Sequence, residues 1–423
     1  MNKQSVPINL LDKVKYELNQ RDRFQYFFTY YIVDGQLDSN RLEEAVDEVY
    51  KANYKLNQRL IWSAGRYKYV PYDFKLVFHV MEASDEEVDN PAAWLENQAT
   101  NCIRSSDEAP LIVQLIRSEN RTLLILLHHH IYYDGSSAYA LFNQLIGFYN
   151  GERPELLTTL DDRDVLKNKI PKRDSFSAVR KCFFVASHLM KSIYYLSSLN
   201  AVRKIYKHNS FDKVCYRSLT LPLQSKSDVY SSNSAICAAI AKAFLAIKGD
   251  LTDQAVSIAI PANFRNANQQ SLFGNLVYSI SVKLENENVN TMAQVVNRKT
   301  ALFKNPYREW AAYQLFYKLT DRKSKNDLIK TFAKISNKHH FYVTNLGDFQ
   351  KKYTSFFKAC RLRSAGGFNF PIQENYGLIF TIVPYGEAFS LGLSFDERLF
   401  TDKEIERFES ELITAFEFLE PIK

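Results

Sequence analysis

The sequence predicts a mixed α/β protein built as two lobes. Segments with strand patterning and segments with helical periodicity alternate in both halves of the 423-residue chain. A charged stretch with two prolines, ERPELLTTLDDRDVLKNKIPKRD at 152–174, separates the halves. Hydrophobic residues make up 46% of the chain and charged residues 24%, which excludes a disordered protein. We therefore expect a first lobe at 1–160, a crossover segment at 161–210 and a second lobe at 211–423.

The first half begins with a strand and a helix. The aromatic run RFQYFFTYYIV at 23–33 has high strand propensity, and DGQLDSN after it supplies turn residues. Ser39 or Asn40 is suited to cap a helix that starts near Arg41. The further elements expected in this half are a hairpin that turns at Ala64 and Gly65, a helix over 91–102 capped by Asn90, strands at 111–118 and 121–129, and a helix over 136–151.

The second half repeats this mixture. Its expected elements are a helix over 232–248, strands at 254–263 and 274–284, long helices across 290–337, strands at 339–348, 375–386 and 388–399, and a final helix from Thr401 to Leu419. Thr401 is the expected N-cap of that last helix, and Glu404 completes its capping box.

The lack of targeting patterns predicts a cytoplasmic protein. The first twenty residues, MNKQSVPINLLDKVKYELNQ, are charged throughout and lack the apolar core of a secretory signal. No run of 18 apolar residues occurs, so we expect no membrane-spanning helix. The five cysteines are scattered, without a CxxC pair that would indicate a zinc ribbon or a thioredoxin-like site.

Positive charge is concentrated in one segment. The net charge is +7, and residues 165–208 alone hold ten lysines or arginines against one acidic residue. The rest of the chain is near neutral, so we expect no nucleic-acid partner. Within this segment, 176–206 lacks Gly and Pro and has apolar residues three or four apart, which predicts an amphipathic helix. Three interpretations stay open: a helix that packs between the lobes, peripheral contact with an anionic membrane, and docking of an acidic partner protein.

The main chemical signal is LLILLHHHIYYDGSSAYAL, in which three histidines end an apolar strand. Histidine is the usual side chain for proton transfer near neutral pH, because its reference pKa is about 6.5. On a strand, His128 and His130 face one side and His129 the other. Zinc binding by His128 and His130 is an alternative that needs a further ligand, with His339 and His340 as candidates. A purely structural cluster is another alternative.

The residues His129 to Gly135 read HHxxxDG, which resembles the signature of the acyltransferase superfamily of chloramphenicol acetyltransferase, plant BAHD acyltransferases and nonribosomal-peptide condensation domains. Other stretches are similar to the condensation branch and cover nearly the whole chain in order. They are LDSNRLEEAVDEVYKANYKLNQRLIW with Arg59 at the second arginine of an LRTRF-like strand, IPANFRNANQQSLFGNLV, VTNLGD and LGLSFDERLF. The sequence departs from the pattern at His128, an added histidine, and at Asn57, which replaces the first arginine. The BAHD motif DFGWG is absent. No adenylation or carrier domain is attached, so we expect a stand-alone enzyme.

The resemblance implies two chloramphenicol-acetyltransferase-like lobes with a substrate tunnel between them. It implies that His130 is the general base that deprotonates a hydroxyl or amine acceptor, which then attacks an acyl thioester. Asp134 is expected to shape the loop through an ion pair, with Arg59 as the first choice of partner and Arg265 as the second. Gly135 would let the backbone approach the substrate where a Cβ would clash.

Four further positions have lesser roles in this scheme. His129 is expected to pack or to orient the loop. Asn275, Asn345 and Tyr133 are candidate contacts to the substrate or to the oxyanion. For both asparagines, ordinary turn or strand-end bonding is an equally good explanation.

The resemblance implies no metal and no bound cofactor. The co-substrate would be an acyl-CoA or an acyl-phosphopantetheinyl carrier protein, and the acceptor a hydroxyl or amine, with lipids included. Because carrier proteins are usually acidic, the basic segment 165–208 would be their dock, or would hold the enzyme at a membrane that supplies a lipid. The alternatives to acyl transfer are a non-catalytic docking platform for a carrier protein, which the intact motif speaks against, and a condensation-type cyclase or epimerase.

Overall fold

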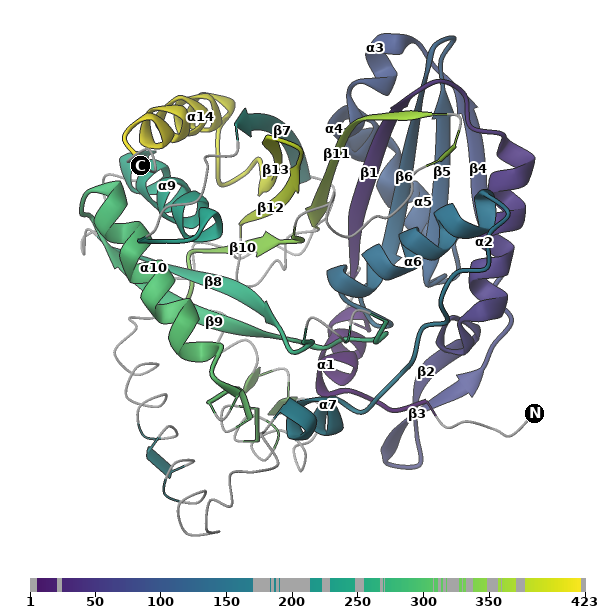
Figure 1. Cartoon of the computed structure of the whole chain (residues 1–423), viewed down its shortest axis with the longest axis horizontal. Helices are drawn as coiled ribbons and strands as arrows, with labels where there is room; N and C mark the ends of the chain where they lie inside the picture. The colour runs from purple at the N-terminus through teal and green to yellow at the C-terminus, as the bar shows by residue number, and fades with distance from the viewer. Residues whose placement is uncertain are drawn as a thin grey trace.

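The computed structural model describes residues 6–20, 25–169, 214–222, 229–247, 255–266, 271–306, 338–347, 360–369 and 377–419, together with single residues between these ranges. The described strands form a five-stranded sheet, a six-stranded sheet and a separate hairpin. Figure 1 shows the two larger sheets side by side, each with helices on its outer face. The predicted mixed α/β class with two lobes is confirmed.

The N-terminal lobe is built around the five-stranded sheet, in the order β11-β1-β6-β5-β4. Its elements from the first half of the chain are α1 (Leu10–Asn19), β1 (Tyr26–Asp34), α2 (Ser39–Ala52), the hairpin of β2 (Gln58–Ser63) and β3 (Arg66–Pro71), β4 (Val77–Glu82), α3 (Asp85–Val88), α4 (Pro91–Trp94), α5 (Thr100–Ser105), β5 (Leu111–Arg117), β6 (Arg121–His129), α6 (Gly135–Tyr149) and α7 (Asp162–Lys169). Helices α2 and α6 lie against each other on one face of this sheet (Figure 1).

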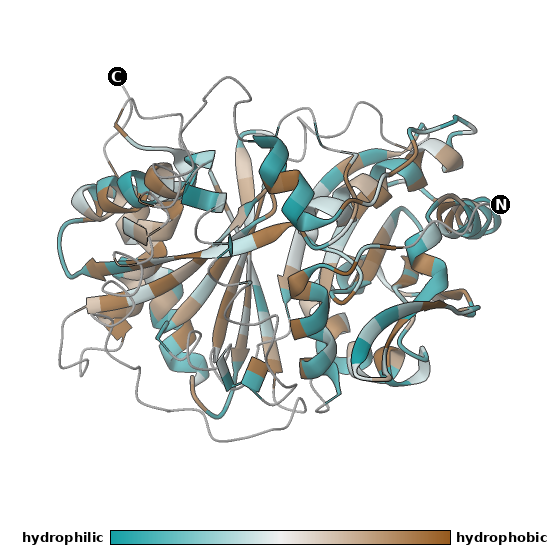
Figure 2. Ribbon diagram, turned by 90° about the horizontal axis from the view of Figure 1, so that it is seen from below, coloured by the Kyte–Doolittle hydropathy of each residue, from teal (hydrophilic) through white to brown (hydrophobic). Residues whose placement is uncertain are grey.

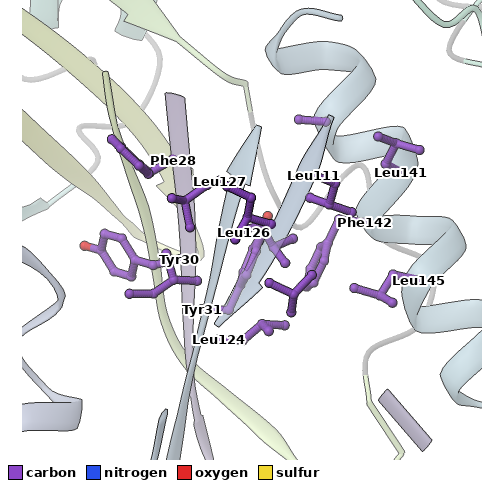
Figure 3. Packing of buried hydrophobic residues seen from close by; sticks show 14 of the residues in the cluster. Phe28, Tyr30, Tyr31, Leu111, Leu124, Leu126, Leu127, Leu141, Phe142 and Leu145 are labelled. Carbon is purple, nitrogen blue, oxygen red and sulfur yellow. The ribbon is translucent and has the colours of Figure 1, made fainter. Parts of the chain in front are cut away.

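Strand β1 is buried on both faces, which explains its continuous aromatic run. Tyr31 stacks on Phe142 of α6 with 3.8 Å between ring centroids. Tyr30 points to the opposite side, where its hydroxyl lies 2.9 Å from the Ser218 hydroxyl of the other lobe. Figure 3 shows Tyr31 among leucines of β6 and α6, and Phe28 and Tyr30 on the other side of the strand. The lobes are therefore joined directly along β1.

The C-terminal lobe is built around the six-stranded sheet, in the order β7-β13-β12-β10-β8-β9. Its elements are β7 (Val214–Pro222), α9 (Ser232–Ile247), β8 (Ala255–Asn263), β9 (Val277–Glu285), α10 (Val289–Phe303), β10 (Phe341–Asn345), β12 (Leu378–Tyr385), β13 (Ala388–Asp396) and α14 (Asp402–Glu417). Strand β10 is parallel to both neighbours, and the other pairs in this sheet are antiparallel. Figure 2 shows the strands of both sheets largely brown or pale and the outer helical turns largely teal, so each core lies between a sheet and its helices.

One strand crosses from the second half of the chain into the first lobe. Strand β11 (Arg361–Asn369) pairs antiparallel with β1, from Phe27 opposite Asn369 to Asp34 opposite Arg361. It also approaches the other sheet so closely that a Cβ on Gly392 of β13 would lie 1.9 Å from the Gly367 carbonyl oxygen. The expected boundary at 211 therefore does not separate the lobes completely. The substrate tunnel remains a prediction.

The sequence placed most elements correctly and missed some. The capping box of Thr401 and Glu404 is confirmed. The N-cap of α2 is Asp38, which accepts from the Arg41 N–H. The expected caps, Ser39 and Asn40, are therefore wrong by one and two residues. The helix expected over 91–102 contains a π-helical turn and extends to Ser105. The elements that the sequence did not predict are α1, α3, β4, α7, β7 and β11.

The predicted amphipathic helix at 176–206 lies outside the described residues, apart from four single positions that include the exposed Phe183 and Met190. Its three interpretations stay open, and membrane contact stays a prediction. Within the described part of the chain, no helix has the length and apolar character needed to cross a membrane.

Candidate active site

The HHxxxDG motif lies where a central strand turns into a helix. Strand β6 ends at His129, and Asp134 is the N-cap of α6, its Oδ1 accepting from the Ser137 N–H at 2.9 Å. This turn places His130 at the end of the sheet, beside the loop 264–276 that joins β8 and β9. The site is therefore formed by the N-terminal lobe and a loop of the C-terminal lobe.

The His130 ring is held by that loop. Its Nδ1 lies 3.1 Å from Oδ1 of Asn275, and the ring makes an edge-to-face contact with the Phe27 ring, with 5.1 Å between centroids. The predicted alternation also holds, since His128 contacts Phe27 as well, whereas His129 contacts Tyr26 on the other side.

The hydrogen bonds of Asn275 fix the tautomer of His130. The Asn275 Nδ2 donates to Asp12 Oδ1 at 2.7 Å and to the His130 carbonyl at 2.9 Å, and these groups only accept. The Asn275 Oδ1 therefore faces the ring, and His130 Nδ1 carries the hydrogen. The Nε2 then has a free lone pair, and it has no hydrogen-bond partner among the described residues. This nitrogen is the one in position to act as a base.

Burial lowers the pKa of His130 well below its ordinary value, and the positive charge of Lys15 acts in the same direction. The Asp134 carboxylate and the Asn275 bond raise the pKa but do not outweigh burial. The ring is therefore neutral at physiological pH, as a general base requires.

Asp134 forms a buried ion pair with Arg265, at 2.9 Å between Oδ2 and Nη1. The same Oδ2 accepts from the Leu276 N–H at 2.7 Å. Burial would raise the pKa of Asp134, but Arg265 and these bonds hold it below its usual value. Arg265 also donates to the Ser137 hydroxyl and to the Gly274 carbonyl, so one side chain joins the helix start to the loop 264–276.

The first-choice partner for Asp134 was wrong. Arg59 lies on the hairpin strand β2 and pairs with Asp107 at 2.8 Å, with its guanidinium 3.7 Å above the Tyr72 ring. Arg265, the second choice, makes the contact. The motif alone does not distinguish the two arginines, because each is far from Asp134 along the chain.

Tyr133 and His128 are engaged within the N-terminal lobe. The Tyr133 hydroxyl donates to the Pro110 carbonyl at 2.9 Å and lies 3.1 Å from His128 Nδ1. The other nitrogen of His128 is 2.9 Å from the Thr29 hydroxyl. Tyr133 is fully buried, so the predicted substrate contact by its side chain is contradicted. The bonds of His128 also leave neither nitrogen for a metal.

Three other expectations need correction. A Cβ on Gly135 would lie 2.5 Å from the Leu346 side chain of the other lobe, so the missing side chain makes room for protein rather than for substrate. Asn345, next to Leu346, donates to Asn233 and accepts from the Gly347 N–H, both at 2.8 Å. These are strand-end bonds, the alternative left open for this residue. Asn275 likewise orients His130 instead of offering its amide to substrate.

The zinc alternative is not supported by the geometry. His339 bonds to Ser281, and His340 accepts from the Ser257 N–H, both in the C-terminal lobe. Across the described residues, no three His, Cys, Asp or Glu side chains are arranged to hold a metal ion.

Comparison with known proteins identifies the fold. Residues 16–167 match the family model described as "Condensation domain". The first condensation domain of the CDA synthetase has a TM-score of 0.70 at 13% identity, with 100% of this chain and 98% of that chain covered. The chain has the condensation-domain fold. The predicted resemblance to this superfamily is thereby confirmed.

Further relatives share this condensation-domain fold. The starter condensation domain of rhizomide synthetase RzmA, solved in complex with C8-CoA and Leu-SNAC, has a TM-score of 0.66 at 13% identity and covers 99% of this chain and 96% of its own. The epimerization domain from the third module of tyrocidine synthetase B has a TM-score of 0.61 at 14% identity. The match covers 95% of this chain and 93% of that domain. Surfactin synthase subunit 2 of Bacillus subtilis (strain 168) is 28% identical over 177 residues, which are 40% of this chain and only 5% of that subunit.

The condensation-domain fold also brings two residues to the site that sequence reasoning missed. Asp12 accepts from Asn275, and Lys15 carries the charge that acts on His130; both lie on α1. The available signal was the helical spacing of Leu10, Val14 and Leu18 after Asn9.

Proposed function

We propose that the protein is an acyltransferase that moves an acyl group from a phosphopantetheine thioester to an amine or hydroxyl acceptor. The observation that carries this proposal is the hydrogen bond between His130 Nδ1 and Asn275 Oδ1, which leaves the Nε2 lone pair to accept a proton. Burial lowers the pKa of His130, so the ring is unprotonated at neutral pH, which is the state in which Nε2 can accept a proton.

In the proposed reaction, His130 Nε2 takes the proton of the acceptor while the acceptor nitrogen or oxygen bonds to the thioester carbonyl carbon. The tetrahedral oxyanion then collapses, the C–S bond breaks, and the leaving thiolate takes the proton back from His130. Asp134 takes no part in proton transfer, because Arg265, Ser137 and Leu276 hold its oxygens. It fixes the turn that carries the base.

The fold supports the donor class. A starter condensation domain of the same fold binds C8-CoA and Leu-SNAC, an acyl thioester and an aminoacyl thioester analogue. We therefore take an acyl-CoA or an acyl carrier protein as the donor and an amine as the first acceptor to test. Hydroxyl acceptors, including lipids, come second.

The test is a thiol-release assay with acyl-CoAs and acyl carrier proteins, with pooled amine, hydroxyl and lipid acceptors and products read by mass spectrometry. We expect His130→Ala to slow product formation about 10²–10⁴-fold, the usual contribution of a positioned base. His79→Ala is the matched control, because His79 is exposed on β4. Equal rates in wild type and His130→Ala would refute His130 as the base.

Epimerisation is the second candidate, supported by the tyrocidine epimerization domain of the same fold. It would release no thiol but would exchange the α-proton of a carrier-bound aminoacyl or peptidyl group in heavy water, again only with His130 present. A folded protein that binds a carrier stably but neither releases thiol nor exchanges protons would be a docking platform.

A further inference from the structure

Helix α1 holds Asn275, the residue that orients the proposed base, by its backbone and by its side chain. The Asn9 side-chain amide, at the start of the helix, donates to the Asn275 carbonyl at 3.3 Å. The Asn275 Nδ2 donates in turn to the Asp12 carboxylate at 2.7 Å. Gly274 packs so closely against the helix that an added Cβ would lie 3.2 Å from Asn9 Nδ2. The loop 264–276 and α1 are therefore in direct contact beside His130.

The two oxygens of the buried Asp12 carboxylate have different partners. Its Oδ2 accepts from Lys55 at 3.0 Å, from the Tyr69 hydroxyl at 3.0 Å and from the Asn9 N–H at 3.2 Å. Its Oδ1 accepts from Asn275 and takes no second hydrogen bond from the residues that the structure describes. Burial raises the pKa of Asp12, and the charge of Lys55 acts in the opposite direction. One oxygen is thus fixed by three donors, and this leaves the other directed at Asn275.

Asp12 supplies an acceptor that the Asn275 amide needs. The Nδ2 has two hydrogens, and besides Asp12 it contacts the carbonyls of His130 at 2.9 Å and of Ile131 at 3.1 Å. These two carbonyls can share one hydrogen, and the other has Asp12. A hydrogen bond to a charged acceptor is also stronger than one to a carbonyl. Without Asp12, a buried hydrogen would lose its acceptor, and the amide would no longer be held firmly in one orientation.

We infer that Asp12 is a positioning residue for the proposed base. It holds the Asn275 amide with Oδ1 toward the ring and thereby keeps the hydrogen of His130 on Nδ1. If the amide turned over, its Nδ2 would donate to Nδ1, and the ring hydrogen would move to Nε2, which could then take no proton from the acceptor. The arrangement corresponds to a carboxylate that orients a catalytic histidine, with an amide inserted between the two. The inference rests on the proposed acyl transfer and deepens it.

Nitrogen-15 NMR tests this role without turnover, so its failure can be told apart from a failure of the proposed reaction. The chain has eight histidines, so a protein labelled only in histidine gives few signals, and their comparison with His130→Ala identifies the one to follow. In wild type near pH 7, we expect His130 to carry its hydrogen on Nδ1 and to have a bare Nε2. A wild-type ring with its hydrogen on Nε2 would overturn the inference before any variant of Asp12 is made.

Two substitutions separate the acceptor oxygen of Asp12 from its charge. Both are combined with Lys55→Met, so that no lysine is left buried without a counter-charge. Asp12→Asn keeps an oxygen for Asn275, so it should keep the single tautomer and a kcat within about threefold of wild type. Asp12→Leu removes that oxygen, so it should show both tautomers, with kcat lowered about tenfold to hundredfold and KM little changed.

Glu17→Leu is the matched control. Glu17 is a buried acid of the same helix, but it accepts from the Tyr67 hydroxyl at 2.9 Å instead of from Asn275, so this variant should keep the wild-type tautomer. A single Nδ1–H tautomer in Asp12→Leu would show that Asp12 does not position the base. A mixture of tautomers in Asp12→Asn as well as in Asp12→Leu would also contradict the inference, because the loss would then not depend on the acceptor oxygen.

Discussion

The three consecutive histidines at 128–130 have three different environments. His128 uses both ring nitrogens inside the N-terminal lobe, on Thr29 and Tyr133. His129 is buried with one nitrogen unused, and His130 presents its Nε2 with Asn275 behind it. Only the third is arranged as a base, although all three are neutral at physiological pH.

This arrangement predicts a loss of stability in acid. Burial lowers the pKa of His128 and of His129 to about 3, against about 6.5 in an unfolded chain. Between these values the unfolded chain binds protons that the folded protein does not, so lowering the pH favours unfolding. We expect the free energy of unfolding to fall by up to about 1.4 kcal/mol per pH unit for each histidine, measured by urea unfolding from pH 7 to pH 5.

A variant separates this effect from general acid sensitivity. His128→Gln cannot titrate, so its stability should decline less steeply with falling pH than that of wild type, whatever its stability at pH 7. His79→Gln, at an exposed position, should keep the wild-type slope. An unchanged slope in His128→Gln would contradict the explanation.

The sequence predicted the residues of the motif but not their partners. His130 and Asp134 were found because the motif places them within five residues of each other. Asn275 was found by its own motif and assigned to the substrate, since nothing local shows that its amide points at His130. Partners that lie more than a hundred residues away are fixed by the packing of the lobes, and one sequence does not record that.

Strand β11 can lie close to both β1 and β13 only because glycines stand at the contact positions. Gly367 faces the backbone of β1, where a Cβ would lie 2.7 Å from the Phe28 carbonyl oxygen, and its own carbonyl faces Gly392. The glycines let one strand lie between two sheets. The same glycines explain why β11 was not predicted, because RLRSAGGFN lacks the alternating apolar pattern of the other strands.

Gly392→Ala should therefore destabilise the protein. The added Cβ meets backbone, which cannot rotate away, and overpacking of this kind costs about 1–3 kcal/mol. Chemical denaturation would measure the loss. Ser364→Ala, also on the sheet but removing only a hydroxyl, should change stability by less than about 1 kcal/mol. If the two variants were equally stable, the close approach of β11 and β13 would be disproved.

At the scale of the whole molecule, the lobes are joined at the active site as well as along β11. The loop 264–276 of one lobe carries Arg265 and Asn275, and both bind the motif of the other lobe. The sequence predicted two lobes and their order. It did not predict that they share a strand and a buried ion pair, because both contacts depend on how the lobes face each other.

Replacing Arg265 should therefore lower the free energy of unfolding. Arg265→Met leaves the Asp134 carboxylate buried without a counter-charge, and breaking such a pair typically costs about 3–5 kcal/mol. Arg163→Met, which breaks a half-exposed pair with Asp161, should cost about 1 kcal/mol or less. Denaturant unfolding of both variants tests the difference, and the double variant Arg265→Met with Asp134→Asn should recover part of the loss. Equal effects at the two arginines would argue against a structural role for the buried pair.

Because β11 comes late in the sequence, the first sheet can be completed only late in synthesis of the chain. Residues 26–129 supply four strands of the first sheet, but the free edge of β1 receives its partner only when residue 369 has been made. At typical rates of translation the edge stays open for roughly 10–50 s. During that time it offers unpaired N–H and C=O groups to any extended segment nearby. A fragment ending near residue 167, where the family match ends, would keep this open edge permanently. We therefore expect the first lobe to be more prone to aggregation before β11 covers its edge than after.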